Sequence, residues 1–435
     1  MRTVAFHNLG CKVNAYEMDI IEQKFSENGF QVVPFGQKAD VYVINTCTVT
    51  NMADRKSRQM IHRAKTLNPD AVVIALGCYV QTSPDEVMKD DSVDIAIGNN
   101  KKTTIIEILK KYLEDHEKKA DIIDINHTYE YESMMLENTS DRTRAYIKIQ
   151  DGCNQFCSYC LIPYARGRVR SRDMQEILTE IEGITKKGFK EVVLTGIHVS
   201  SYGITDPNDL SQNKLTDLLE AIEKIPTVER IRLSSLEPRV VTEEFAERIS
   251  KLQKLCPHFH LSLQSGCDAT LKRMNRHYTS DEYYAGVMRL RKYFDDPAIT
   301  TDVIVGFPGE TDEEFEESFA FAKKVGFYEM HIFKYSKRKG TVAEKLPNQV
   351  RDDLKEERSN RMISLGDELS KKFRERHIGK EAKVLFEEAK TIDGKHYFIG
   401  HTPEYIKVAV ETKEDLGNEI RTIVPKAFVN DEVLK

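Results

Sequence analysis

The chain has 435 residues, and at about 150 residues per domain this length allows roughly three domains with a sizeable core. Hydrophobic residues make up 40% and charged residues 31%, with only 22 glycines and 13 prolines, which excludes collagen-like and largely disordered chains. The 64 basic and 70 acidic residues leave a net charge of −6, so any RNA-binding site must be a local patch.

The first twenty residues show no targeting segment. They contain no apolar run long enough for a secretory signal, and no stretch of about 18 apolar residues that could span a membrane follows. We therefore expect a cytoplasmic protein without membrane contact. In that compartment thiols stay reduced, so the eight cysteines are expected to be ligands or buried side chains rather than disulfides.

Residues 1–116 predict an α/β domain with a parallel sheet. The apolar runs TVAF, VYVIN and VVIALG alternate with helical patterns over 16–28 and 53–67, as expected for strands joined by crossover helices. Residues 117–140 are polar and weakly periodic, which predicts a linker with one strand in DIIDI.

Residues 141–371 predict a second parallel sheet. Six strand-like runs alternate with helical candidates: AYIKI, EVVLTG, RIRLSS, HFHLSLQ, ITTDVIVGF and MHIFKY. Six β/α units predict a partial, TIM-like barrel, closed or open, in which chemistry gathers at the carboxyl ends of the strands. A long helix over 351–377 leads to residues 372–435, where period-two alternation and DG and GN turns predict a small antiparallel β-barrel.

Three cysteines lie within eight residues directly after the first strand of the second sheet, in the sequence CNQFCSYC. A CxxxCxxC loop can bind three irons of a cubane iron–sulfur cluster and leave the fourth iron open to a small molecule. The alternative is a zinc knuckle, but no fourth cysteine lies nearby. Cys153, Cys157 and Cys160 therefore predict a cluster with an open corner.

A second set of three cysteines follows three predicted strands of the first domain. Cys11, Cys47 and Cys78 end AFHNLGC, VYVINTC and VVIALGC, and parallel strands bring such turns to one edge of a sheet. We favour a second three-thiolate metal site over three small buried side chains. Of the other two cysteines, Cys256 is expected to pack in the core, and Cys267 lies on the predicted functional rim.

The 153–160 motif resembles the radical S-adenosylmethionine (SAM) superfamily. Together with GCKVNAYE at 10–17, NTC at 45–47 and GC at 77–78 it resembles the methylthiotransferase branch, and the C-terminal module resembles its TRAM domain. LTGIHVSSYG, IRLSSLEP, HLSLQSGCDATLKRMNR and TTDVIVGFPGET are similar to the branch that acts on tRNA threonylcarbamoyladenosine.

The resemblance implies two 4Fe–4S clusters and SAM as cofactors. The cysteines at 153–160 would hold the cluster that cleaves SAM, and Cys11, Cys47 and Cys78 an auxiliary cluster associated with the inserted sulfur. One SAM would methylate sulfur and a second would supply a 5′-deoxyadenosyl radical, because an adenine C–H bond is beyond acid–base catalysis. The residues expected at the SAM site are Tyr159, Thr195, Gly196, Ser235, Glu237, Val305 and Gly306.

Contacts with tRNA phosphates need local positive charge. Two basic segments lie at the predicted mouth, and they contain Arg166, Arg168, Arg170 and Arg172, and Lys334, Lys337, Arg338 and Lys339. If extended, the alternating arginines would point to one side, although some could bind a substrate carboxylate or pair with acids instead. A third patch at 55–63 is equally well explained as a solvated basic face.

Three hypotheses for function follow. In the first, the chain methylthiolates threonylcarbamoyladenosine beside the tRNA anticodon, with flavodoxin or ferredoxin as electron donor. In the second, the same chemistry acts on isopentenyladenosine tRNA or on a ribosomal-protein aspartate. In the third, the chain is a non-catalytic iron–sulfur electron carrier or RNA-binding module.

Overall fold

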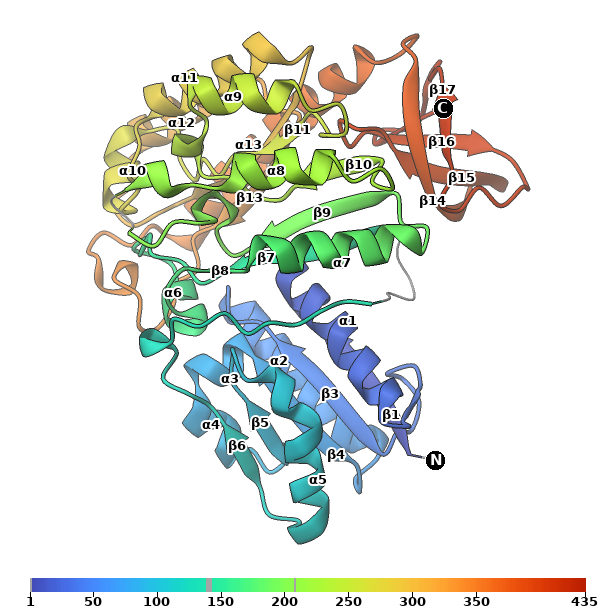
Figure 1. Ribbon diagram of the computed structural model, residues 1–435. Helices are drawn as coiled ribbons and strands as arrows, with labels where there is room; N and C mark the ends of the chain where they lie inside the picture. Colours follow the sequence, from blue (N-terminus) through green and yellow to red (C-terminus); the bar gives the residue numbers. More distant parts are fainter. Residues whose placement is uncertain (1, 138–142, 207–208) are drawn as a thin grey trace.

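The computed structural model describes residues 2–137, 143–206 and 209–435, shown in Figure 1. Its architecture confirms the predicted α/β class with parallel sheets. Short 3-10 turns connect the main elements: η1 (Lys102–Thr104), η2 (Ile125–His127), η3 (Val199–Ser201), η4 (Leu210–Gln212), η5 (Pro238–Val240) and η6 (Ala343–Lys345). Within the described ranges, no helix is both long enough and apolar enough to cross a bilayer.

The first sheet has the strand order β2-β1-β3-β4-β5-β6, and all its pairs are parallel. Its strands are β1 (Thr3–Asn8), β2 (Gln31–Val32), β3 (Val41–Thr46), β4 (Val72–Gly77), β5 (Ile95–Ile97) and β6 (Lys119–Asp121). Its helices are α1 (Lys12–Glu27), α2 (Asn51–Leu67), α3 (Cys78–Thr82), α4 (Pro84–Lys89) and α5 (Ile105–Asp115). Side chains of β3 and β4 are buried on both faces, as sheet strands covered by helices on both sides must be.

The predicted linker takes part in this packing. Strand β6 pairs with β5, so the first sheet extends beyond the expected boundary at residue 116. Met134 and Leu136 are buried in the main core. The expected boundary at 140 lies outside the described residues.

The central part contains six mutually parallel strands in the order β7-β9-β10-β11-β12-β13. They are β7 (Arg144–Asp151), β9 (Glu191–Gly196), β10 (Arg230–Leu233), β11 (His258–His260), β12 (Ala298–Val305) and β13 (Glu329–Lys334). Bridges from Ile231 to Leu255 and from Leu236 to Leu261 join β10 to the segment around β11. The short β8 (Arg170–Ser171) runs antiparallel to β7 at the edge.

Helices follow these strands and cover one face of the sheet (Figure 1). They include α7 (Met174–Lys186), α8 (Leu215–Glu223), α9 (Glu243–Ser250), α11 (Ser280–Tyr293) and α12 (Asp312–Val325). The short α10 (Asp268–Arg273) precedes α11, and the short α6 (Ile162–Arg166) packs against α3 of the first part. Capping boxes begin α11 at Thr279 and α12 at Thr311. In each, the threonine hydroxyl accepts from the backbone N–H of the glutamate three residues later, and that glutamate's carboxylate accepts from the threonine N–H. Phe259 and Val303 pack toward the helices, whereas His260 and Asp302 project from the opposite, inner face.

The C-terminal part is a mostly antiparallel sheet in the order β17-β14-β15-β16-β19-β18, reached through helix α13 (Asp352–Glu375). Its strands are β14 (Ala382–Ile392), β15 (Lys395–His401), β16 (Lys407–Glu411), β17 (Ile420–Ile423), β18 (Phe428–Asn430) and β19 (Val433–Leu434). The predicted antiparallel sheet is thus present, and β16 and β19 form its parallel pair. Arg230 of β10 donates to the Lys383 carbonyl of β14, and Arg232 donates to the Pro403 carbonyl between β15 and β16, so β10 anchors the C-terminal part.

Candidate functional site

The 153–160 motif forms a loop at the carboxyl end of β7. The loop begins at Gly152, whose φ of +74° lies in the left-handed region and whose Cβ would overlap the carbonyl oxygen of Arg168. The Ser158 amide donates to the Met274 carbonyl at 2.9 Å. This bond ties the loop to the segment after α10 and holds its cysteines over the end of the sheet.

The three thiols of this loop lie close enough to influence one another's ionisation. Burial raises the pKa of Cys153 to about 12, and the neighbouring Cys157 also raises it. Burial, and then Cys157 and Cys153, raise the pKa of Cys160. Arg276 Nη1 donates to Cys157 Sγ at 3.1 Å, so a guanidinium faces the sulfurs. Such thiols keep their protons until a metal ion displaces them.

The second cysteine set converges as the parallel-sheet argument expects. Cys11 precedes α1, Cys47 follows β3 and Cys78 begins α3, and β1, β3 and β4 are direct neighbours in the sheet. Burial first, and then the proximity of Cys78 and Cys11, raise the pKa of Cys47 to about 11. Asn14 links the turns, because its Nδ2 donates to Asn45 Oδ1 at 3.2 Å.

A buried ionic network lies between the two cysteine sets, and Arg166 is at its centre. Arg166 Nε donates to Cys78 Sγ at 3.3 Å, and its Nη1 donates to Glu17 Oε1 at 2.6 Å and to Asp151 Oδ2 at 3.3 Å. Lys148 Nζ lies 2.8 Å from Glu17 Oε1 and 2.7 Å from Asp151 Oδ2. Burial alone would raise the pKa of Glu17, but the surrounding cations, Arg166 first, hold it well below its usual range.

The arginines after the loop do not form the RNA-binding surface that the sequence predicts. Arg166, Arg170 and Arg172 are buried and bound internally, Arg170 to the Arg166 carbonyl and Arg172 to Glu180 and the Tyr16 hydroxyl. A buried guanidinium that is already paired cannot reach a phosphate. Arg168 is half-buried and lies 4.6 Å over the Phe156 ring.

The second basic segment, after β13, also contains both a buried, paired arginine and exposed cations. Arg338 is buried, and its guanidinium lies 2.8 Å from Asp54 Oδ2 of α2, so it fastens the first sheet's helix to the central part. Lys334 is exposed and paired with Glu356. Lys337 and Lys339 are exposed.

The residues expected at the SAM site have unequal access. Ser235 is exposed, Tyr159 is half-buried with its ring against Phe307, and Gly306 has a φ of +70°. Thr195 is buried. Val305 is buried with its side chain in the core, so only its backbone can face a ligand.

Gly196 and Glu237 follow β9 and β10 and have different surroundings. Gly196 abuts Gln150 of β7, where a Cβ would lie 3.0 Å from the Gln150 carbonyl oxygen. Glu237 is buried, and its Oε1 accepts from Arg239 Nε at 2.9 Å.

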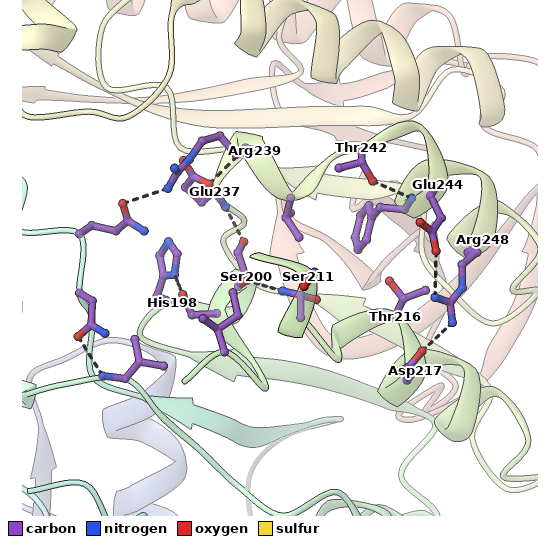
Figure 2. A pocket seen from close by; sticks show the side chains of 18 residues that line it. His198, Ser200, Ser211, Thr216, Asp217, Glu237, Arg239, Thr242, Glu244 and Arg248 are labelled. Atoms are coloured by element: carbon purple, nitrogen blue, oxygen red, sulfur yellow. Dashed lines mark hydrogen bonds and ion pairs between the residues drawn. The ribbon is translucent and has the colours of Figure 1, made fainter. Parts of the chain in front are cut away.

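A cavity of about 420 Å³ opens beside the cysteine loop. Figure 2 shows the side chains that line it. Asn154 and Gln155 of the loop line it together with His198, Ser200 and Glu237 from the ends of β9 and β10. His198 Nε2 is buried without a hydrogen-bond partner, while its Nδ1 contacts Ser201 Oγ at 2.5 Å. Burial first, and then Arg276 and Arg239, lower the pKa of His198 to about 3, so the ring is neutral at physiological pH.

Several of these residues escaped the sequence reasoning. Glu17 and Lys148 are charged residues on a helix and a strand, and nothing local marks them as buried partners. His198 follows β9, so its strand-end position was a signal that the sequence offered, whereas Arg276 lies between α10 and α11 and no such signal marks it.

Two family descriptions match parts of the chain. Residues 147–322 match the radical SAM superfamily, and residues 3–98 match the uncharacterized protein family UPF0004. These two matched ranges contain both cysteine sets.

Relatives match nearly the whole chain. It is 43% identical to the threonylcarbamoyladenosine tRNA methylthiotransferase MtaB of Bacillus subtilis, over 98% of this chain and 94% of the relative. It is 33% identical to the tRNA-2-methylthio-N(6)-dimethylallyladenosine synthase of Acetivibrio thermocellus, over 91% of this chain and 82% of the relative. Its fold is similar to that of the radical SAM methyltransferase TsrM from Kitasatospora setae, with a TM-score of 0.55, 16% identity, and coverage of 77% of this chain and 73% of that chain.

Proposed function

Because the chain belongs to the methylthiotransferase family of radical SAM enzymes, we propose that it attaches a methylthio group to threonylcarbamoyladenosine at position 37 of tRNA. The observation that carries the proposal is the near-full-length identity to a relative of that name, in a chain whose two cysteine sets flank one ionic network. Two SAM molecules and two 4Fe–4S clusters are the cofactors of this reaction.

The cysteine geometry fits clusters better than single zinc ions. Zinc–sulfur bonds of about 2.3 Å place ligand sulfurs about 3.8 Å apart. Within the described ranges, the group of three ligand atoms that all lie within 4.8 Å of one another is His260, Asp302 and His331, which contains no cysteine. Neither cysteine set is therefore compact enough for one zinc ion, whereas a cubane cluster needs ligands spread more widely.

Cys153, Cys157 and Cys160 would hold the first cluster, and Cys11, Cys47 and Cys78 the second. When bound, the first cluster supplies the electron that cleaves SAM to an organic radical able to break a C–H bond. Arg276 and Arg166 place a positive charge against one sulfur of each set, which stabilises the thiolate form. The neutral His198 ring and the Glu237 carboxylate offer an acceptor and an anion to the SAM molecule in the adjoining cavity.

We assign SAM contacts to the backbone and side chains at the strand ends. The residues are Tyr159, Thr195, Gly196, Ser235, Glu237, Val305 and Gly306. The glycines give close backbone approach, and the buried Glu237 suits the methionyl amine, since a carboxylate is the natural partner of an ammonium group.

The tRNA would meet exposed basic and apolar residues near the mouth. Lys337 and Lys339 are exposed there, and Asn51 Nδ2 of α2 donates to the Lys337 carbonyl at 2.9 Å. Met52 and Val342 are 56% and 61% exposed in the same region. Cationic side chains beside exposed apolar ones suit phosphates beside unstacked bases.

The remaining assignments follow from the same family. The six parallel strands would form the partial barrel, and the C-terminal sheet would close as a TRAM barrel. The domains would be 1–116, the linker 117–140, 141–371 and 372–435. Flavodoxin or ferredoxin would supply electrons in the cytoplasm.

Nucleoside mass spectrometry tests the proposed substrate. tRNA from cells with and without the gene is digested, and loss of methylthio-threonylcarbamoyladenosine on deletion, with its return on complementation, is expected. An unchanged profile combined with SAM cleavage by the purified protein would favour a ribosomal-protein aspartate. Loss of methylthio-isopentenyladenosine instead would leave the proposed reaction in place and make isopentenyladenosine tRNA its substrate. If the protein with both clusters bound forms no 5′-deoxyadenosine, the enzymatic hypotheses are excluded and only the non-catalytic one remains.

A further inference from the structure

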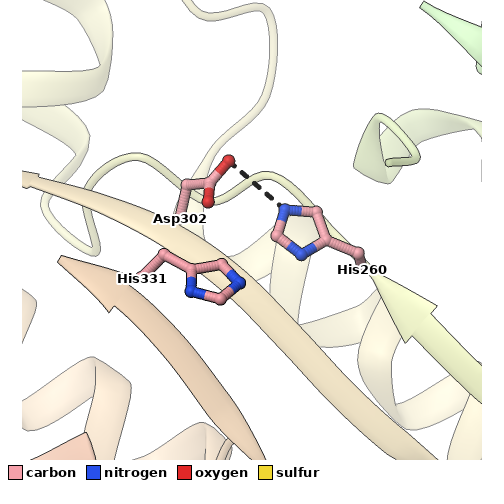
Figure 3. A group of neighbouring side chains, drawn as sticks. All are labelled: His260, Asp302 and His331. Atoms are coloured by element: carbon pink, nitrogen blue, oxygen red, sulfur yellow. Dashed lines mark ion pairs between the residues drawn. The ribbon is translucent and has the colours of Figure 1, made fainter. Parts of the chain in front are cut away.

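The inner face of the central sheet carries two histidines and an aspartate from three neighbouring strands. His260 of β11 lies beside Thr300 of β12, and Asp302 of β12 lies beside His331 of β13, so all four side chains project from one face. The ligand atoms of His260, Asp302 and His331 lie within 4.8 Å of one another, and Figure 3 shows the three side chains next to one another. We call these three residues the inner cluster.

His260 faces Asp302 through its Nε2 atom. Its Nδ1 lies 3.0 Å from Thr300 Oγ1, which holds the ring in place and leaves Nε2 as the nitrogen available to a ligand. Nε2 is buried and has no hydrogen-bond partner, although Asp302 Oδ2 lies 3.3 Å away. Buried polar atoms are rarely left unsatisfied, and a cation between this nitrogen and this oxygen would satisfy both. A metal-bound histidine commonly contacts an oxygen through its other nitrogen, as His260 does here.

Asp302 and His331 are also available to an ion. Within the described residues, the ion-pair partner of the Asp302 carboxylate is His260 alone. The His331 ring stacks on the His260 ring with centroids 5.9 Å apart, and in the same ranges its nitrogens contact no protein donor or acceptor. The side chains of His260 and Asp302 are 12% and 30% exposed, and His331 is exposed, so an ion can enter from solvent.

The distances and the ligand types fit a transition-metal ion. Zinc–nitrogen and zinc–oxygen bonds of about 2.1 Å at a tetrahedral angle place the ligand atoms about 3.4 Å apart. The separation of 3.3 Å between His260 Nε2 and Asp302 Oδ2 matches this value, and the exposed His331 supplies the third ligand. Two imidazoles and one carboxylate are typical ligands of mononuclear zinc and iron(II) sites.

We propose that the inner cluster binds one divalent transition-metal ion through His260 Nε2, Asp302 and His331. This site is separate from both cysteine sets, because its ligands are nitrogen and oxygen atoms on β11, β12 and β13. Three protein ligands leave coordination positions open, so the ion can also bind water or an anionic oxygen of another molecule. The ion would bind whatever the substrate of the enzyme is.

The alternative is an ion pair between a protonated His260 and Asp302. Such a pair would direct an N–H group at the carboxylate, but no hydrogen bond joins the two side chains. A histidine–aspartate pair on α2 and α4 differs in this respect, because His62 Nε2 and Asp90 Oδ2 are hydrogen-bonded at 2.8 Å. As far as the structure is described, that pair has no third ligand, so it is the matched control.

Zinc binding by the enzyme that holds both clusters tests the proposal. The protein is dialysed anaerobically against a series of buffered Zn²⁺ concentrations, and zinc, iron and sulfide are counted per chain. We expect one zinc per chain without loss of iron. His331→Gln should weaken zinc binding at least about tenfold without harming the fold, because this side chain is exposed. Asp302→Asn should weaken it further, since it removes the negative charge, and His62→Gln should leave it unchanged.

Thr300→Val tests the orientation of the His260 ring. The change removes the oxygen that Nδ1 contacts and keeps the volume of the side chain. Loss of such an outer contact weakens metal binding about tenfold to a hundredfold, whereas Thr300→Ser keeps the oxygen and should keep the affinity. Equal Tm values of the wild type and the two variants without zinc would show that the effect is one of binding and not of folding.

X-ray absorption at the zinc edge identifies the ligands. We expect nitrogen and oxygen neighbours at about 2.0–2.2 Å, whereas sulfur at about 2.3 Å would mean that zinc occupies cysteines. Sulfur ligation, or no zinc bound at any concentration, overturns the proposal. Equal binding by the wild type, His331→Gln and Asp302→Asn, or loss of zinc in His62→Gln, overturns it as well.

Discussion

The two cysteine sets differ in how the chain assembles them. Cys153, Cys157 and Cys160 lie on one loop anchored between β7 and α6. Cys11, Cys47 and Cys78 follow three separate strands and meet only because β1, β3 and β4 are adjacent and parallel. The first set is a local property of eight residues, and the second is a property of a folded sheet.

Arg166 couples these unlike sites. It lies at the end of α6, just after the loop that carries the first set, and it donates to Cys78 of the second set. Its partners Glu17 and Asp151 come from α1 and β7. The dispersed site is thus held against the local one by a buried network that reaches both sheets.

The largest effect is expected from breaking the local site. Cys157→Ala removes one of three ligands from the loop, so SAM cleavage should fall to background while iron held by the first sheet stays bound. Anaerobic assays of 5′-deoxyadenosine, with iron counted per chain, measure both. Retained cleavage would contradict the assignment of this loop, and Cys267→Ala is the matched control because that thiol is buried elsewhere.

Breaking the dispersed site should have a narrower effect. Cys47→Ala is expected to spare SAM cleavage and stop methylthiolation, since only the second set loses a ligand. Product and 5′-deoxyadenosine are measured in the same reaction by mass spectrometry. Normal methylthiolated product from this variant would exclude the second set from the reaction.

Cutting the link between the sites should cost stability. Arg166→Met removes a cation from buried Glu17 and Asp151, and loss of one partner of a buried ion pair costs about 3–5 kcal/mol. Thermal unfolding under anaerobic conditions should show a lower Tm than in Arg168→Met, whose side chain is only half-buried. Equal Tm values in the two variants would show that the network contributes little.

The smallest effect concerns the cavity beside the local site. The pKa of His198 is lowered to about 3, so its ring should stay neutral from pH 8 to pH 5. In the unfolded chain His198 is protonated below about pH 6.5, whereas in the folded chain it stays neutral. The unfolded state therefore gains protons as the pH falls, so the stabilising contribution of His198 is present above about pH 6.5 and is lost below it. NMR of the 15N-labelled imidazoles, with the resonance assigned through His198→Gln, measures this directly. A His198 ring that protonates near pH 6 would contradict the burial argument.

Much of the architecture was predictable from the sequence, because the periodicity of apolar residues and the position of a residue at the end of a strand are local signals. The alternation of apolar runs predicted both parallel sheets. The one strand expected in the linker, in DIIDI at 121–125, is found slightly earlier as β6 and joins the first sheet, and Met134 packs in the core, because a polar segment can still add to an existing edge. The arginine series after the loop was misjudged. Its alternation indicates a shared face, but Arg166 and Arg172 face buried acids rather than solvent.

The sequence by itself determined the chemistry of this protein: the cysteine spacing, the family to which the chain belongs and the strand ends where ligands gather. These follow from residue type and short-range spacing, which tertiary packing does not alter. Only the tertiary structure decided which charged residues are internal partners and which are free. Lys12 and Lys148 are both lysines near a cysteine motif, yet Lys148 pairs with Glu17 and Asp151 while Lys12 has no described partner. Charge pairing depends on which distant elements pack together, and no local pattern encodes that.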